Sequence, residues 1–261
     1  MSRYFEEVNK LLSEQIPFVS VILVDATGSV PQDAGTKMLV TESGLHFGTV
    51  GGGKVEKKAI EEAQALLKTD DRSIRTKFFN WSLDRDVGMT CGGLVKLFME
   101  KHNTTTWNIV VFGAGHVANA LIDVIHPLDC RITCIDPRQE WLDKLPESAS
   151  LKKIHAEDMV SAVKDIPEGS FVLLMTMGHT TDKPILLEIL RSRKFPYLGV
   201  IGSEAKAVRL RTDVKEAGLP EEKNKEYFCP VGLPIGTNHP REIAISISAQ
   251  LIQERDREKP L

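Results

Sequence analysis

The sequence has little of what marks a secreted, membrane-bound or nucleic-acid-binding protein. Its N-terminal stretch, MSRYFEEVNKLLSEQ, mixes charged and apolar residues and lacks the continuous apolar core of a secretory signal. No segment approaches the roughly 20 apolar residues that a helix needs to cross a bilayer. The formal net charge is only -3, from 33 Lys and Arg against 36 Asp and Glu, so no broad basic surface is present. We therefore expect a cytoplasmic protein that binds neither membrane nor nucleic acid.

Cysteine is also scarce, with four residues in the chain: Cys91, Cys130, Cys134 and Cys229. A reducing compartment favours free thiols over disulfides. Cys130 and Cys134 lie close together, but residues 131–135 have the pattern of a strand, which puts a full strand length between them. We expect this pair to be packed thiols rather than a metal or disulfide site.

The length and composition indicate two globular domains. The chain has 261 residues, of which 42% are hydrophobic and 26% charged, as in ordinary soluble proteins. A polar stretch, KHNTTT at positions 101–106, has no apolar periodicity and resembles a linker. It predicts a smaller N-terminal α+β domain, 1–103, and a C-terminal domain, 107–261.

The N-terminal part is predicted to contain strands, two helices and loops rich in glycine. The helices are expected at 3–14 and 54–67, and the strands at 18–24, 36–41, 45–50, 77–81 and 94–100. Mixed elements without a repeating strand–helix rhythm indicate an α+β arrangement.

From Trp107 the chain alternates strand and helix, which predicts a parallel α/β sheet of Rossmann type. Strands are expected at 108–112, 131–135, 171–176 and 197–201, and helices at 116–125, 139–144 and 183–193. A weaker unit at 152–163 supplies the third strand and helix, and a last helix runs from Pro240 to about Arg255.

The sequence Gly113-Ala114-Gly115-His116-Val117-Ala118 follows an apolar strand and opens a helix. Glycine at Gly113 and Gly115 allows a phosphate to approach the helix N-terminus, which favours anions. Asp136 ends the next strand, where a carboxylate can accept hydrogen bonds from a ribose diol. Together these residues predict a nucleotide-binding crevice, with an empty Rossmann scaffold as the alternative.

Other polar residues are expected at the same edge of the sheet. Arg138 either contacts a phosphate or adenine face or is a solvated arginine. His116 projects from the phosphate turn, and His179 and Asp182 follow the fourth strand, so the three side chains are candidates to converge. We expect these three side chains to form hydrogen bonds with a substrate rather than to bind a metal ion, because they lack the fixed short sequence spacing of metal ligands.

Three further loops are candidate ligand cradles. Gly202 and Ser203 end the fifth strand and precede a helix with Lys206, which suits an anion. Gly51, Gly52 and Gly53 lead into a helix, and Gly92 and Gly93 follow Cys91, so both loops could present backbone amides to a polar ligand. Cys91 is a candidate reactive, sulfur-handling thiol. Tight turns are the alternative for the two N-terminal glycine groups, and a solvated basic face is the alternative for the loop with Lys206.

Taken in order, these loops resemble the XdhC/CoxI family of xanthine dehydrogenase accessory proteins over nearly the whole chain. The resemblance is carried by Gly28-Ser29-Val30-Pro31 with Gly35-Thr36-Lys37-Met38, Gly48 to Gly53 with Glu56, Met89 to Gly93, Gly113 to Val117, Asp136-Pro137-Arg138, Gly199 to Ser203 with Lys206, and Gly232 to Gly236. Gln32 departs from the arginine usual in the family, and Met177-Gly178-His179 departs from its usual histidine-rich run.

The resemblance implies a maturation chaperone rather than an enzyme. Such a protein binds the molybdenum cofactor, as molybdopterin or its dinucleotide, and shields it while a cysteine desulfurase adds sulfur. It then delivers the cofactor to apo-xanthine dehydrogenase or a related molybdoenzyme. The implied cofactor-binding set is Lys37, Gly51, Gly52, Gly53, Glu56, Cys91, Gly92, Gly93, Gly113, Gly115, His116, Asp136, Arg138, His179, Asp182, Gly202, Ser203 and Lys206.

Two other functions remain open at this point. An NAD(P)-dependent oxidoreductase would use His116 or His179 as acid or base beside a bound NAD(P). A regulatory sensor would bind a nucleotide in the Rossmann domain and contact a partner through the N-terminal domain. A homodimer is left open as well.

Overall fold

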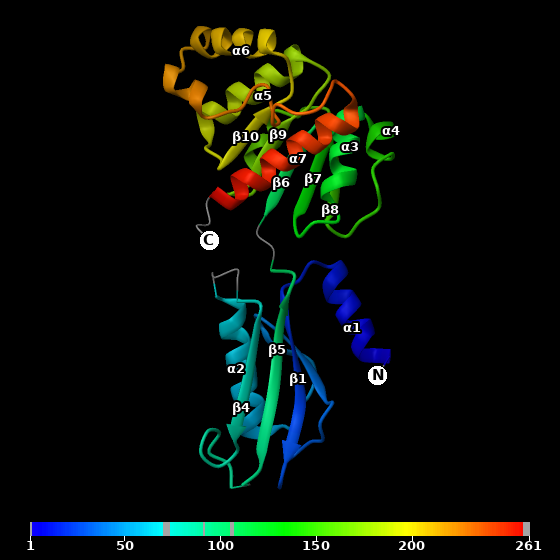
Figure 1. Cartoon of the computed structure of the whole chain (residues 1–261), viewed down its shortest axis with the longest axis vertical. Coiled ribbons are helices and arrows are strands. Elements are labelled where there is room, and N and C mark those ends of the chain that lie inside the picture. Colours follow the sequence, from blue (N-terminus) through cyan, green and yellow to red (C-terminus); the bar gives the residue numbers. More distant parts are fainter. Residues whose placement is uncertain (1, 70–73, 91, 105–106, 258–261) are drawn as a thin grey trace. The chain divides into compact units, whose positions relative to one another are not determined.

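The computed structural model describes residues 2–69, 74–90, 92–104 and 107–257. The chain divides into two compact units, Met1–Thr104 and Thr105–Leu261, which are described separately (Figure 1). Within the described ranges, no helix is both long enough and apolar enough to span a membrane.

The N-terminal unit combines an antiparallel sheet with two helices. Its elements are α1 (Ser2–Ser13), β1 (Phe18–Thr27), β2 (Lys37–Thr41), β3 (Gly44–Gly48), α2 (Gly53–Leu67), β4 (Thr76–Ser82) and β5 (Leu94–His102). The five strands lie in the order β3-β2-β1-β5-β4, and every pair is antiparallel. The predicted α+β arrangement is confirmed.

Alternation along β1 explains how the two helices cover opposite faces of this sheet. Val19, Val21 and Leu23 point to the core that contains α2. Phe18 points to the other face, where it packs with Leu11 of α1. Both cores are therefore built from the period-2 pattern of one strand.

The strand register brings the glycine-rich loops to one end of the sheet. Thr27 at the end of β1 and Ser82 at the end of β4 both pair with Leu94, the first residue of β5. Gly48 at the end of β3 pairs with Met38 near the start of β2. The loops that leave or enter these strands, and the start of α2, consequently share that end.

The C-terminal unit is a Rossmann-type domain, as predicted. Its elements are β6 (Asn108–Phe112), α3 (His116–Ile125), β7 (Arg131–Asp136), α4 (Gln139–Leu142), β8 (Leu151–His155), η1 (Ser161–Asp165), β9 (Phe171–Leu174), α5 (His179–Ser192), β10 (Tyr197–Val200), α6 (Glu204–Glu216), η2 (Glu221–Lys225) and α7 (Pro240–Arg257). The five strands are parallel and follow the order β10-β9-β6-β7-β8. The helix expected after the third strand is only the short 3-10 helix η1.

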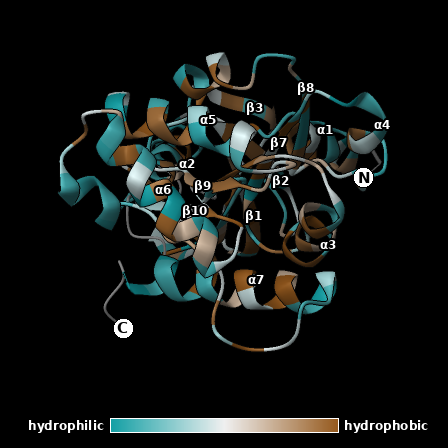
Figure 2. Cartoon of the chain, turned by 90° about the horizontal axis from the view of Figure 1, so that it is seen from above, coloured by the Kyte–Doolittle hydropathy of each residue, from teal (hydrophilic) through white to brown (hydrophobic). Residues whose placement is uncertain are grey.

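Helices cover both faces of the parallel sheet. One core contains residues of β6, α3 and α7, and the other contains residues of β9, α5 and α6. In Figure 2, α3 and α7 each carry both hydrophobic and hydrophilic residues, as helices that cover a sheet do. The strand order reverses between β6 and β9, so a ligand crevice belongs outside their carboxyl ends.

Candidate functional site

Three loops of the N-terminal unit meet at the glycine-rich end of its sheet. We call residues 28–37 the first loop, 48–53 the second and 83–93 the third. A Cβ atom at Gly93 would stand 2.4 Å from the carbonyl oxygen of Ser29, and one at Gly51 would stand 2.7 Å from Cγ of Pro31. The second and third loops therefore both pack closely against the first, which only glycine permits at these two positions.

Helix α2 begins where these loops meet, and its N-terminus is open. Gly52 and Gly53 have φ angles of 68° and 57°, and a Cβ atom on either would meet nothing within 4 Å. Gly52 occupies the N-cap position, and no side chain caps the helix. The first N–H groups of a helix have no partner inside it, and together with the helix dipole they attract anions.

Lysines of α2 tie the third loop to the helix. The ammonium group of Lys54 donates a hydrogen bond to the carbonyl of Gly88, and that of Lys58 donates one to the carbonyl of Asp86. Gly92 lies in the same loop with open space around it. Cys91, the candidate sulfur-handling thiol, lies outside the described residues.

Lys37 and Glu56 both contact Thr49 in the second loop. The Thr49 hydroxyl donates a hydrogen bond to Glu56, and the Thr49 amide donates one to the Lys37 carbonyl at 3.1 Å. The Lys37 ammonium lies 3.3 Å from the carbonyl of Gly35, to which it donates. These two predicted site residues thus hold the backbone of the first and second loops in place.

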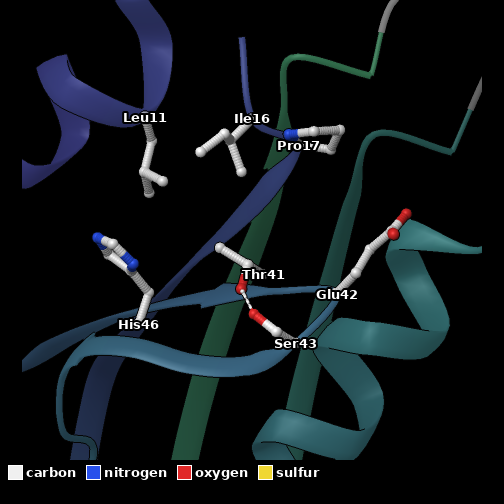
Figure 3. A pocket seen from close by; sticks show the side chains of 7 residues that line it. All are labelled: Leu11, Ile16, Pro17, Thr41, Glu42, Ser43 and His46. Carbon is white, nitrogen blue, oxygen red and sulfur yellow. Dashed lines mark hydrogen bonds between the residues drawn. The ribbon is translucent and has the colours of Figure 1, made fainter. Parts of the chain in front are cut away.

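A cavity of about 350 Å³ lies in the same unit, at the other end of β2 (Figure 3). Leu11, Ile16 and Pro17 form its apolar side, and Thr41 and Ser43 form a hydrogen-bonded polar side. Glu42 and His46 complete the lining. None of the predicted site residues lines this cavity.

In the C-terminal unit the two glycines of the Gly113-Ala114-Gly115 turn have different roles. Gly113 has a φ of 103°, and a Cβ atom there would stand 2.3 Å from the carbonyl oxygen of Met175. It allows the turn after β6 to lie against the segment after β9. Gly115 is the N-cap of α3 and has nothing within 4 Å, so it leaves room for a ligand.

Asp136 lies at the end of β7 with its side chain only 2% exposed. Its oxygens accept hydrogen bonds from Ala114 N at 2.7 Å and from Arg138 N, Nε and Nη2 at 2.8 Å each. Burial raises the pKa of this carboxyl, but the bonds from Arg138 and Ala114 outweigh it and leave the pKa below its usual value. Asp136 thus fixes both the glycine turn and Arg138.

Three side chains near this turn contact the indole ring of Trp141. The guanidinium carbon of Arg138 lies 5.1 Å from the ring centre of Trp141, and Nζ of Lys144 lies 4.0 Å from it. The ring of His116 meets the same indole edge-on, with 4.8 Å between ring centres. His116, Arg138 and Lys144 therefore share one aromatic partner.

Lys206 has a different partner from the one that its sequence context indicates. Its ammonium forms an ion pair with Asp182, which is fully buried, and donates a hydrogen bond to the Ile201 carbonyl at 2.7 Å. Asp182 also accepts a bond from the Thr176 hydroxyl at 2.7 Å. Lys206 therefore joins the end of β10 to the start of α5, and its charge is balanced internally.

The remaining residues of that predicted cradle lie close to Lys206. A Cβ atom at Gly202 would stand 2.5 Å from Cδ of Lys206, so this glycine makes room for the lysine side chain. Ser203 caps α6 by accepting a hydrogen bond from the Lys206 amide at 3.4 Å. Both residues serve the local structure and also remain exposed.

His179 pairs with an aspartate from another helix. Its Nε2 lies 2.9 Å from Oδ2 of Asp213, whose Oδ1 accepts a hydrogen bond from Lys183 at 2.6 Å. The side chains of His179 and Asp213 are only 17% and 9% exposed. His179 and Asp182 thus have separate partners, and His116 shares none of them within the described ranges. No group of three metal-binding side chains occurs there either.

Asp213 and Trp141 are among the residues of these arrangements that sequence reasoning missed. Asp213 lies near the C-terminal end of α6, and nothing local to the sequence connects it with His179, 34 positions earlier. Trp141 gave a usable signal, since it follows Arg138, the N-cap residue of α4, by three positions, which is about one helical turn.

Comparison with known proteins finds relatives along most of the chain. Residues 109–251 match the XdhC Rossmann domain, and residues 11–77 match the XdhC and CoxI family. The uncharacterized protein YqeB of Escherichia coli K12 is 34% identical over 97% of this chain and 46% of its own length. A probable xanthine dehydrogenase subunit of Bacillus subtilis is 26% identical over 57% of this chain and 43% of its own length. The chain thus spans less than half of these two relatives.

Two other proteins are similar over most of both chains. The molybdenum cofactor insertion chaperone PaoD of E. coli is 24% identical over 91% of this chain and 83% of its own length. A solved structure from Bacillus halodurans, described as a xanthine dehydrogenase, superposes with a TM-score of 0.51 and covers 96% of each chain. At 20% identity, that second likeness concerns the fold alone.

Proposed function

Because the chain belongs to the XdhC and CoxI family and carries its Rossmann domain, we propose that it binds the molybdenum cofactor and serves the maturation of a molybdoenzyme. The relative PaoD, which is named as a molybdenum cofactor insertion chaperone, supports this role. The client is xanthine dehydrogenase or a related enzyme. The protein acts as a carrier of the cofactor and not as the enzyme that uses it.

The observation that carries this proposal is the meeting of the three glycine loops at the N-terminus of α2. The cofactor is a pterin with a phosphate group, and an uncapped helix start with open positions at Gly52 and Gly53 suits that phosphate. Gly92 leaves further open space in the third loop. Lys54 and Lys58 place two positive charges beside the same loop. The residues present therefore fit the anionic group of this cofactor.

When bound, the cofactor supplies the molybdenum dithiolene centre that the client enzyme requires. The chain's own task is to hold the anionic end with backbone amides and to cover the rest with the loops. In the finer form of the proposal, a cysteine desulfurase sulfurates the held cofactor, with Cys91 handling sulfur. The Rossmann crevice of the C-terminal unit holds a nucleotide. The protein works in the cytoplasm, as a monomer or a homodimer.

The proposal is tested by identifying the small molecule that co-purifies with the protein. After anaerobic purification we expect molybdenum and a pterin in a fixed ratio to the chain. Lys54→Met should lower the molybdenum content, because it releases the Gly88 carbonyl and with it the third loop. Lys57→Met, an exposed position on the same helix, is the matched control and should retain the cofactor. A nicotinamide nucleotide without pterin, together with substrate turnover, would instead identify an oxidoreductase.

A further inference from the structure

Asp136 has no acceptor capacity left for a ribose diol. An ionised carboxylate offers about four lone-pair sites, and four N–H groups already donate to this one: Ala114 N and the N, Nε and Nη2 of Arg138. All four bonds are short and the side chain is buried. A diol could therefore bond to Asp136 only by displacing Arg138.

Arg138, in contrast, has donors to spare. A guanidinium group has five N–H donors, and Nε and Nη2 each direct one of them to Asp136. The other donors have no acceptor among the residues that the structure describes. One face of the group lies on Trp141, and the side chain is 26% exposed. The group is thus held in one orientation with an open edge, and such a fork matches a phosphate.

The charges around Arg138 nearly balance, so a phosphate would be recognised by the fixed geometry of the guanidinium group and not by a strongly positive field. Arg138 and Asp136 balance each other. Lys144 stands on the same indole as Arg138, while the carboxylate of Glu140 acts on Arg138 in the opposite sense. The distinctive feature of this site is the guanidinium group of Arg138, which Asp136 and Trp141 hold in place close to the open position at Gly115.

We propose that the crevice of the C-terminal unit takes a nucleotide whose ribose carries a phosphate monoester, and that Arg138 binds this phosphate. Asp136 is then a positioning residue, which holds Arg138 and the amide of Ala114 in place. This inference rests on the proposed function only for the claim that the crevice holds a nucleotide. It does not involve the loops of the N-terminal unit.

NADP⁺ and NAD⁺ are suitable probes because they differ only in the phosphate on the adenosine ribose. Calorimetry on the full chain should show NADP⁺ bound at least tenfold more tightly than NAD⁺. Arg138→Met keeps an apolar stem on Trp141 but removes every side-chain donor. This substitution should weaken the binding of NADP⁺ at least tenfold. It should strengthen the binding of NAD⁺, because two acceptor sites of Asp136 become free for the ribose diol. A purely structural defect would weaken both ligands.

Arg191→Met is the matched control, because Arg191 lies exposed in the last turn of α5 and should leave both affinities unchanged. Arg138→Lys should restore part of the preference for NADP⁺. Equal or tighter binding of NAD⁺ by the parent protein would overturn the inference, as would binding of neither nucleotide. Molybdenum content, measured on the same preparations, reports separately on the proposed cofactor role. Its absence with the NADP⁺ preference intact would count against that role alone.

Discussion

Gly93 lies so close to Ser29 that a Cβ atom on it would stand 2.4 Å from the Ser29 carbonyl oxygen. The contact joins two loops that are more than 60 positions apart in the sequence. Gly92, the preceding residue, has open space around it. Two adjacent glycines of one loop therefore have separable roles: Gly93 sets how the loops pack, and Gly92 leaves room beside them.

Gly93→Ala should destabilise the N-terminal unit, because the added methyl group forces the first and third loops apart. We expect a loss of about 1–3 kcal/mol in the free energy of unfolding, the usual cost of overpacking. Gly92→Ala should change it by no more than about 0.5 kcal/mol. Chemical denaturation of both variants measures the difference. Equal stability of the two would mean that the loops do not pack as described.

The glycines after β6 give a second matched pair. Gly113→Ala should cost about 3 kcal/mol, since the methyl group would collide with the Met175 carbonyl at a positive φ. Gly115→Ala should cost no more than about 1 kcal/mol at its N-cap position, yet weaken nucleotide binding about tenfold, or 1.4 kcal/mol. Thermal unfolding and calorimetry separate the effects. If Gly115→Ala bound nucleotide normally, the crevice would not hold a phosphate at that turn.

Lys206→Met should destabilise the C-terminal unit because it leaves Asp182 buried without its cation. Removing one partner of a buried ion pair costs about 3–5 kcal/mol. Arg209→Met, at an exposed position one turn further along α6, should be almost neutral. Urea denaturation of both variants measures the difference in the free energy of unfolding. Should Lys206→Met prove as stable as Arg209→Met but lose ligand binding, Lys206 would be a ligand group after all.

The buried thiols predict how stability changes at alkaline pH. Burial raises the pKa of Cys130 to about 11 and that of Cys134 to about 12, whereas an unfolded cysteine ionises near pH 8.5, at roughly its ordinary pKa. Stability should therefore fall as pH rises above about 8.5, by up to about 1.4 kcal/mol per pH unit for each thiol. Cys134→Ala should flatten this slope. A slope unaffected by the substitution would show that the folded thiol already ionises normally.

The fold could be predicted from the sequence where the pattern is strong and local. Continuous apolar runs such as 109–112 indicated buried parallel strands, and Gly113 marked the tight turn after the first of them. The region 152–163 has a weaker pattern, and there the expected helix is the short η1. Local propensity predicts the length of such a helix poorly, because tertiary contacts routinely override it.

The sequence predicts which residues of the candidate site lie at the ends of strands, but not which side chains bond to one another there. Asp136 and Arg138 fall where expected, but their four mutual and backbone hydrogen bonds are not visible in the sequence. Lys206 has the context of an anion cradle, and its partner Asp182 lies 24 positions away on another helix. Charge pairing between distant elements decides whether a lysine is available to a ligand, and periodicity carries no information about it.

Transfer of the cofactor to a client tests the central claim most directly. The cofactor-loaded protein is mixed with apo-xanthine dehydrogenase, and urate formation is followed against an equal amount of free cofactor. The account expects client activity to rise well above that control, with no oxidation of NADPH or NADH by this protein alone. Client activity no higher than with free cofactor, accompanied by steady turnover of NADPH or NADH, would contradict it.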